Sequence, residues 1–111
     1  MKREERLRKN YHFKRVYQGG KSRVSNYTVI IFRPNFLEYN RLGVSISKKV
    51  GKSVARHHLK RLYCEAFYRL KDNLKTGYDI IIVARKGAAM LKFADVLQEL
   101  SGLLKKGKLY L

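Results

Sequence analysis

Acidic residues are scarce in this sequence of 111 residues, which has 8 Asp and Glu against 26 Lys and Arg and a formal net charge of +18. A net charge of about 2 to 8 is enough to keep a small domain soluble, so the excess repels itself and predicts a polyanionic partner. The acids are scattered, and no two stand at a spacing that suits a catalytic metal or acid–base chemistry. We therefore expect a binding protein that holds no cofactor by itself.

Cysteine, proline and long hydrophobic runs are also nearly absent. The single Cys64 cannot form an internal disulfide, which is typical of a reducing compartment and predicts a cytoplasmic location. The apolar runs Tyr27–Phe32 and Ile80–Ala84 are far shorter than the roughly 20 residues of a membrane span, so no membrane partner is expected. With one proline and no linker composition, residues 1–111 are expected to form a single RNA-binding domain.

Hydrophobic periodicity predicts an α+β sandwich, with three helices on a small, mostly antiparallel sheet. The loop between the first two long strands is short enough for an antiparallel hairpin, and Ser53 is expected to cap the long helix. In the second strand, Gly43, Ser45 and Ser47 would leave one face smooth and open. The predicted helices are 7–17, 53–75 and 95–106, and the predicted strands are 27–33, 42–47 and 78–84, with a short extra strand near 22–25.

The stretch from Ser47 to Arg61 concentrates the positive charge. It runs from a strand end through a lysine-rich turn into the start of a helix, where free N–H groups and the helix dipole favour a phosphate. Cations at this end oppose the dipole, so a bound phosphate backbone explains them better than folding does; a solvated basic face is the alternative. The residues expected to contact RNA are Lys48, Lys49, Lys52, Arg56, His57, His58, Lys60 and Arg61.

Aromatic residues are the second feature of interest. Phe13 and Tyr17 lie four residues apart on a basic helix, so they could stack on unpaired bases or belong to the core. Tyr27 and Phe32 allow the same two interpretations, with at least one of them expected in the core. A stacked base is worth about 1–3 kcal/mol.

Four segments, in this order and spacing, resemble the protein subunit of bacterial ribonuclease P. The resemblance implies a ribonucleoprotein that removes the 5′ leader from precursor tRNA by hydrolysing one phosphodiester bond. It implies that the RNA subunit holds Mg²⁺ and cleaves the substrate, and that the protein alone is inactive. The protein is expected to bind that RNA and the leader, and to improve the affinity of the holoenzyme for substrate and magnesium. The matching segments are 6–10 with 13, 16 and 17; 42–52; 54–62 with 65–67; and 78–86.

The resemblance also implies a left-handed crossover between parallel strands, and no obligatory protein partner. A structural protein of another ribonucleoprotein, such as a ribosomal component, is the alternative function. A DNA-binding module is a third possibility, but no helix-turn-helix pairing is visible.

The family's basic helix carries Arg-Asn-Arg, one further residue, and Lys-Arg. Arg56, Lys60 and Arg61 match it, whereas His57 and His58 replace the Asn and the second Arg. The second replacement exchanges a permanent charge for a side chain that titrates near neutral pH, so RNA binding is expected to be weaker or more pH-sensitive.

The leader cleft of the family lies between the first helix and the sheet. Phe13 and Tyr17 match its aromatic positions, and either Ile31 or Phe32 takes the strand position, depending on a shift of one residue. The residues expected to bind the leader are Arg8, Lys9, Phe13, Lys14, Tyr17, Phe32, Ser45, Arg85 and Lys86.

Overall fold

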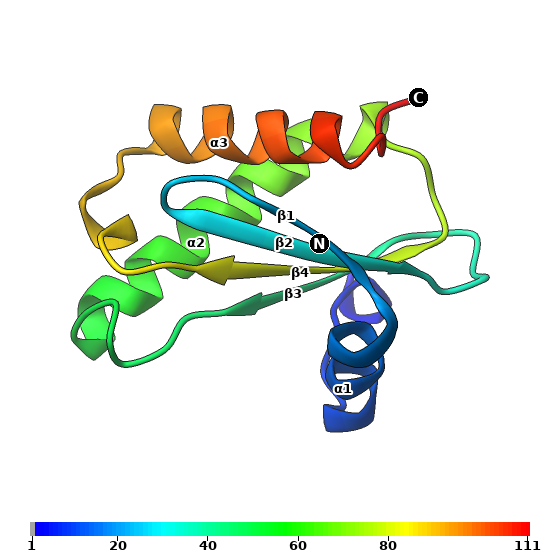
Figure 1. Ribbon diagram of the computed structural model, residues 1–111, viewed down its shortest axis with the longest axis horizontal. Coiled ribbons are helices and arrows are strands. Elements are labelled where there is room, and N and C mark those ends of the chain that lie inside the picture. The colour runs from blue at the N-terminus through cyan, green and yellow to red at the C-terminus, as the bar shows by residue number, and fades with distance from the viewer. Residues whose placement is uncertain (1) are drawn as a thin grey trace.

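The computed structural model describes residues 2–111 and contains three α-helices and a four-stranded sheet (Figure 1). The predicted α+β sandwich, its element order and the short extra strand are confirmed. The elements are α1 (Asn10–Gly19), β1 (Lys21–Val24), β2 (Thr28–Pro34), β3 (Arg41–Ser45), α2 (Ser53–Leu70), β4 (Tyr78–Ala84) and α3 (Phe93–Lys106), with 3-10 turns at Arg3–Glu5, Lys71–Asn73 and Ala88–Met90.

The strand order is β1-β2-β4-β3, with antiparallel pairs β1–β2 and β2–β4 and a parallel pair β3–β4. The predicted hairpin between β2 and β3 is wrong, because β4 lies between them. Ile80, Ile81 and Ile82 are fully buried, so β4 needs cover on both faces and both edges. β3, with Gly43 and Ser45, takes an edge instead. The hairpin of this sheet is β1–β2, whose strands meet with Ser22 opposite Ile31.

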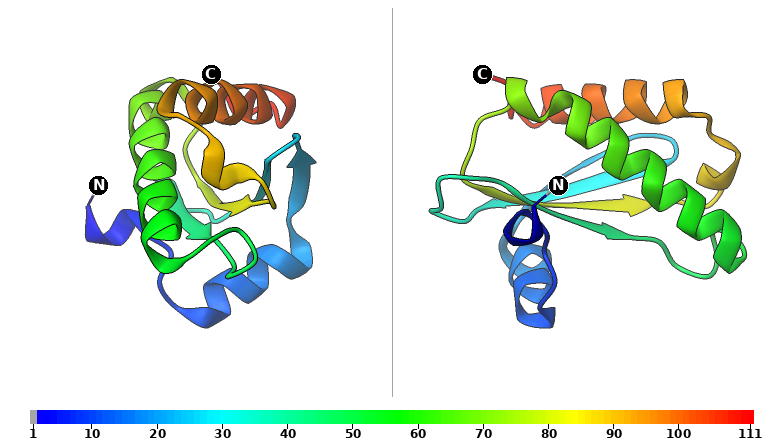
Figure 2. Two further views of the ribbon diagram at one scale, coloured as in Figure 1. Left: turned by 90° about the vertical axis from the view of Figure 1, so that its left-hand side faces the viewer. Right: turned by 180° about the vertical axis from the view of Figure 1, so that it is seen from behind.

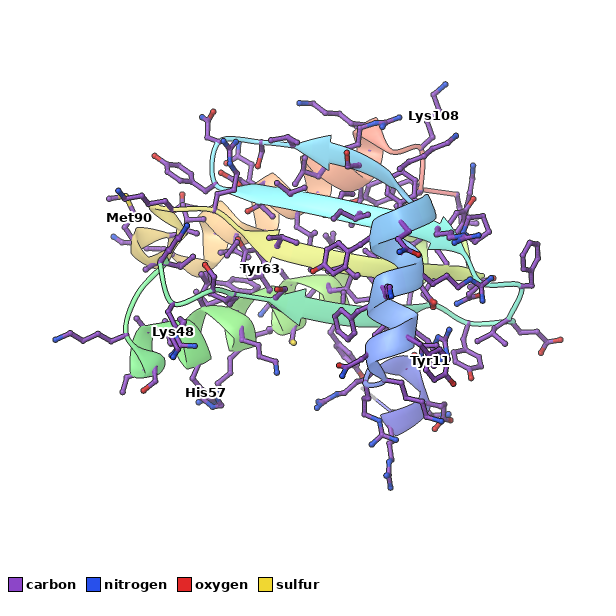
Figure 3. The ribbon with its side chains drawn as sticks, turned by 60° about the horizontal axis from the view of Figure 1, so that its bottom comes forward. Tyr11, Lys48, His57, Tyr63, Met90 and Lys108 are labelled. Carbon is purple, nitrogen blue, oxygen red and sulfur yellow. The ribbon has the colours of Figure 1, made fainter. Side chains whose placement is uncertain are left out.

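The connection between the parallel strands passes through α2. In Figure 3, β3 and β4 point the same way, β4 lies above β3, and α2 returns behind the sheet. This is a left-handed crossover, as the family resemblance implied. Such connections are right-handed in about 98% of cases, so the strand pattern alone would have predicted the opposite hand.

α2 and α3 cover one face of the sheet, and α1 crosses the other (Figures 1 and 2). The apolar stripe of α2 forms the main core, where Tyr63 is fully buried and its hydroxyl lies 2.7 Å from the hydroxyl of Thr28. Val16 anchors α1 in a smaller cluster with Leu7 and Ile81 on the opposite face. The buried residues of α2 are Leu59, Tyr63, Ala66 and Phe67.

The first helix begins three residues later than predicted. The N–H of Leu7 donates to the carbonyl oxygen of Leu42 at 2.9 Å, and Arg6 forms a bridge with the same residue. This pairing keeps the chain extended along the edge of β3 until Lys9, the N-cap of α1. The N-terminal segment is thereby fixed beside α2.

A polar cluster joins α1 to the sheet. The buried carboxylate of Asp79 accepts two hydrogen bonds at 2.8 Å from the Arg41 guanidinium and one at 2.9 Å from the amide of Asn35. The ring of His12 lies 3.4 Å from Arg41. Burial, and then the charge of Arg41, lower the pKa of His12, so the neutral imidazole is favoured here.

We predict that Asp79→Asn lowers the free energy of unfolding by about 3 kcal/mol, because the Arg41 guanidinium then loses its charged partner in a partly buried site. Urea denaturation at neutral pH measures the change. Asp72→Asn is the matched control, since Asp72 is exposed and its replacement should matter by less than about 0.5 kcal/mol. Equal unfolding free energies for the two variants would contradict this account.

Candidate RNA-binding site

The basic turn after β3 presents its lysines to solvent. Val50 is buried and anchors the turn, while Lys48 and Lys49 are exposed (Figure 3). The prediction that Ser53 caps α2 is wrong: Lys52 is the N-cap, without a side-chain hydrogen bond to the helix, and the first turn holds no acid. The helix start therefore keeps its N–H groups and its positive dipole end for an external anion.

The turn after β3 and the first turns of α2 form a basic wall beside the edge of β3. Its residues are Lys48, Lys49, Lys52, Arg56, His57, His58, Lys60 and Arg61. The Nε of Arg56 donates to the carbonyl oxygen of Gly51 at 3.1 Å, which fixes this guanidinium at the helix start. His58 and Arg61 are exposed on another arc of the helix. One hollow along this wall is lined by Val44, Ile46, Ser53, Arg56, His57 and Lys60.

The face of the sheet beside α1 is only partly covered. α1 crosses the strands near one end, and Figure 3 shows the other end open toward the viewer. Val29, Val83 and Ser45 point to this open face and are partly exposed. We call these three residues, with Ile31, the open sheet face.

Phe13 and Tyr17 differ in their surroundings. Phe13 is half-buried in the α1–sheet cluster, and its ring covers Gly43 so closely that a Cβ there would lie 2.6 Å from two ring atoms. The strand face predicted to be smooth and open is therefore already covered at Gly43. Tyr17 lies one helical turn after Phe13, on the same side of α1, and is 47% exposed, so its ring is accessible to a ligand.

The placement of Phe32 disagrees with the prediction. Phe32 is 4% exposed and belongs to the main core, where its ring packs against Gly107 at the end of α3. Ile31, the alternative, points to the α1 side and packs in the smaller cluster. The strand position of the cleft is thus aliphatic in this chain, and Phe32 is not available to a ligand on the α1 side.

A second hollow lies along the edge of β3, between the N-terminal segment and the basic wall. It has a volume of about 240 Å³, and Val44 and Lys60 line both this hollow and the one beside α2. Arg6, which sequence reasoning left out of the site, lines it because the bridge to Leu42 brings the N-terminal segment there. Its lining residues are Arg6, Leu7, Arg8, Phe13, Leu42, Gly43, Val44, Lys60 and Cys64.

Cys64 contributes surface rather than charge to this hollow. Burial raises the pKa of its thiol, so the neutral form is favoured near neutral pH. A passive role for the side chain fits this environment.

The remaining predicted leader contacts surround the open sheet face. Arg85 and Lys86 follow β4 and are exposed; the Arg85 guanidinium donates to the carbonyl oxygen of Ser25 at 2.8 Å. Because β3 and β4 are parallel, these two cations lie at the same end of the sheet as the turn with Lys48. At the other end, Lys9 and Lys14 are exposed on the start and middle of α1.

Residues 2–111 have neither a metal-binding cluster nor a membrane-spanning helix. No three His, Cys, Asp or Glu side chains gather where they could hold a metal ion. No helix in this part of the chain has the length and apolar character needed to cross a membrane.

Comparisons with known proteins show the family of this chain. The family model described as Ribonuclease P matches residues 1–108. The ribonuclease P protein component of Caldanaerobacter subterraneus subsp. tengcongensis is 45% identical over 105 residues, which cover 95% of this chain and 90% of the relative. The structure of the Staphylococcus aureus RNase P protein has a TM-score of 0.89 at 32% identity and covers 96% of this chain and 98% of that chain. The structure of the Thermotoga maritima RNase P protein has a TM-score of 0.84 at 37% identity and covers 92% of this chain and 96% of that chain.

The sandwich, its basic helix and its partly open sheet define a small bacterial RNA-binding protein that works within a ribonucleoprotein. The chain belongs to the ribonuclease P protein family, whose members are the protein component of ribonuclease P, and it takes part in tRNA processing with ribonuclease P RNA. This membership sets aside the ribosomal component and the DNA-binding module.

We predict that Gly43→Ala lowers the free energy of unfolding by about 1–3 kcal/mol, because the new Cβ would overlap the Phe13 ring and overpack the α1–sheet contact. The double variant Gly43→Ala/Phe13→Leu should recover part of this loss, since leucine can leave the space that the ring occupies. Thermal or urea unfolding measures both. Ser45→Ala, one step along the same face, is the control; if its effect matches that of Gly43→Ala, the Phe13 ring does not constrain position 43.

Proposed function

We propose that this chain binds ribonuclease P RNA with its basic wall and the 5′ leader of precursor tRNA with its open sheet face. The two surfaces carry different chemistry. The wall is cationic and has no Phe or Tyr among its predicted contacts, which suits the phosphates of a folded RNA. The open sheet face is narrow, apolar and bordered by Tyr17, which suits unpaired nucleotides.

The single observation that carries the proposal is the adjacency of these surfaces. Val44 and Lys60 line both hollows, and Val44 directly precedes Ser45 of the open sheet face on β3, so a strand on the sheet and an RNA on α2 would meet along the edge of β3. A protein bound in this way holds the substrate's leader next to the catalytic RNA. It supplies position and positive charge rather than a reacting group.

Within this proposal, hydrolysis belongs to the RNA subunit and its magnesium ions, and the protein alone is inactive. The cations of the wall would neutralise phosphates that otherwise require divalent ions. The protein would therefore reduce the magnesium concentration needed for cleavage. It would also raise substrate affinity through contacts with the leader.

The test separates the two surfaces in a reconstituted holoenzyme at low magnesium. Lys60→Gln/Arg61→Gln should weaken binding of the catalytic RNA by roughly 10- to 100-fold, because two phosphate contacts are lost. Tyr17→Ala should leave that affinity unchanged and weaken binding of precursor tRNA by roughly 5- to 150-fold, the value of one stacked base. Mature tRNA, which has no leader, should bind with equal affinity to the holoenzymes that contain the unaltered protein and Tyr17→Ala.

The matched control is Lys71→Gln/Lys75→Gln, which removes two positive charges near the other end of α2. It should change neither affinity by more than about twofold. No gain in cleavage from the unaltered chain at low magnesium would refute the proposal. Equal losses from the two charge variants would refute the assignment of the wall.

The histidines on α2 give a prediction about pH. Both His57 and His58 are exposed, and histidine side chains lose their charge near neutral pH. Replacing them with Asn and Arg should therefore tighten RNA binding at pH 8 and flatten its change between pH 6 and pH 8. Filter binding to ribonuclease P RNA at constant salt measures this. An unchanged pH profile would show that neither position contacts the RNA.

A further inference from the structure

Four cations gather at the outer edge of the sheet, away from the basic wall and the open sheet face. Lys21 and Arg23 are on β1, and Lys106 and Lys108 are at the end of α3. Two contacts bring them together. Lys21 is the register partner of Phe32, whose ring packs on Gly107. The Nε of Arg23 donates to the carbonyl oxygen of Lys106 at 3.4 Å. We call these four residues the β1-edge cluster.

Folding explains only part of this cluster. Lys106 lies in the last turn of α3 and Arg23 donates to its carbonyl oxygen, so both stabilise the C-terminal end of the helix, whereas Lys21 and Lys108 have no such contact. Among residues 2–111, the two ion pairs join Arg41 with Asp79 and Arg69 with Glu65, so no member of the cluster has a carboxylate partner in the described structure.

The geometry of Arg23 fixes one of these charges at the edge. Its guanidinium also donates to the carbonyl oxygen of Ser22 at 2.7 Å, so two backbone groups hold it. Lys21, Lys106 and Lys108 are exposed around it. The cluster thus combines a positioned guanidinium with mobile ammonium groups, an arrangement suited to phosphates.

The open sheet face ends at β1. Lys21 and Arg23 alternate with Ser22 and Val24 on this strand, so their side chains lie on the α3 side, and a nucleotide strand reaches them by turning over the β1 edge. α1 lies across the strands, so a nucleotide strand that follows the helix crosses the sheet from β3 to β1 (Figure 3). On that path it passes Ser45, then Val83 and Val29, and then Val24 on the outer strand, next to Arg23. In Figure 3 the upper end of α1 leads to β1, and Lys108 is labelled just beyond that strand.

We propose that the β1-edge cluster binds the phosphates of the leader beyond the nucleotides that lie on the open sheet face. This inference rests on the proposed function and extends it to the distal leader. Neighbouring strands are about 4.8 Å apart, so the path between the outer strands is about 14 Å, or about four nucleotides at 3.4 Å each. Because the contacts are to phosphates, they do not depend on the leader sequence.

The experiment measures holoenzyme affinity for precursor tRNAs with leaders of about 4 and about 12 nucleotides, lengths chosen to end before and after the β1 edge. The unaltered protein should bind the long-leader substrate more tightly. Lys21→Gln/Lys108→Gln should remove about 25-fold of that gain at 0.1 M salt, from a slope of about −0.7 per phosphate contact with single strands. Affinity for the short-leader substrate and for ribonuclease P RNA should not change.

Lys71→Gln/Lys75→Gln is the control with the same loss of charge, and a long leader of different sequence should give the same result. If both double variants reduce the gain equally, the effect is one of net charge and the proposal is overturned. The proposal is also overturned if Lys21→Gln/Lys108→Gln weakens binding of the short-leader substrate or of the catalytic RNA as much as it weakens binding of the long-leader substrate. If the unaltered protein gains nothing from the longer leader while Tyr17→Ala still weakens the short-leader complex, this inference fails and the proposed function stands. If Tyr17→Ala also has no effect, the leader-binding function itself fails.

Discussion

The burial of β4 on both faces is the constraint on which the rest of the structure depends. Its isoleucines are fully buried and project alternately to the two sides of the sheet. One face is closed by α2 and α3, and the other needs α1. A helix of 10 residues is about 15 Å long and about 10 Å wide, whereas a strand of seven residues is about 23 Å long. Because α1 lies across the strands, it covers less than half of their length and leaves the open sheet face beside it.

The central position of β4 also brings the charges together. β3 and β4 are parallel, so the turn after β3 and the residues after β4 lie at one end of the sheet. The crossover through α2 then begins at that end, with its N-terminus beside Lys48 and Lys49. The same topology that buries the isoleucines therefore collects cations from two distant parts of the chain. Arg85 and the basic turn are far apart in the sequence.

Patterns within one element predicted this protein well, and pairings between elements did not follow from them. The limits of β4 were predicted at both ends because Gly77 and Arg85 border a segment that is apolar except for Asp79. The buried stripe of α2 followed from helical spacing. The sequence could not reveal that β4 separates β2 from β3, since a short loop allows a hairpin without requiring it.

The same limit applies to the site. β2 is apolar on both faces, so its sequence lacks the alternation that would show which face Phe32 occupies, and a shift of one residue exchanges the faces. Arg6 escaped prediction because a single backbone bridge to Leu42 places it, and a bridge has no periodic signal. The basic wall was easier to predict, since its residues are consecutive on one turn and one helix.

The scarcity of acids has a consequence for how such a protein binds RNA. In a chain with balanced charge, surface cations are paired, and each phosphate must displace a carboxylate before it gains a contact. Here the described residues form only two ion pairs, one buried under α1 and one on an exposed turn of α2. The cations of the wall, those that follow β4 and those of the β1 edge carry no carboxylate partner in the described structure, so phosphates can approach them without that exchange. Their mutual repulsion in the free protein, which RNA relieves, adds to the driving force for assembly. The large net charge is therefore available to RNA at three places around one sheet: the basic wall, the residues after β4 and the β1-edge cluster.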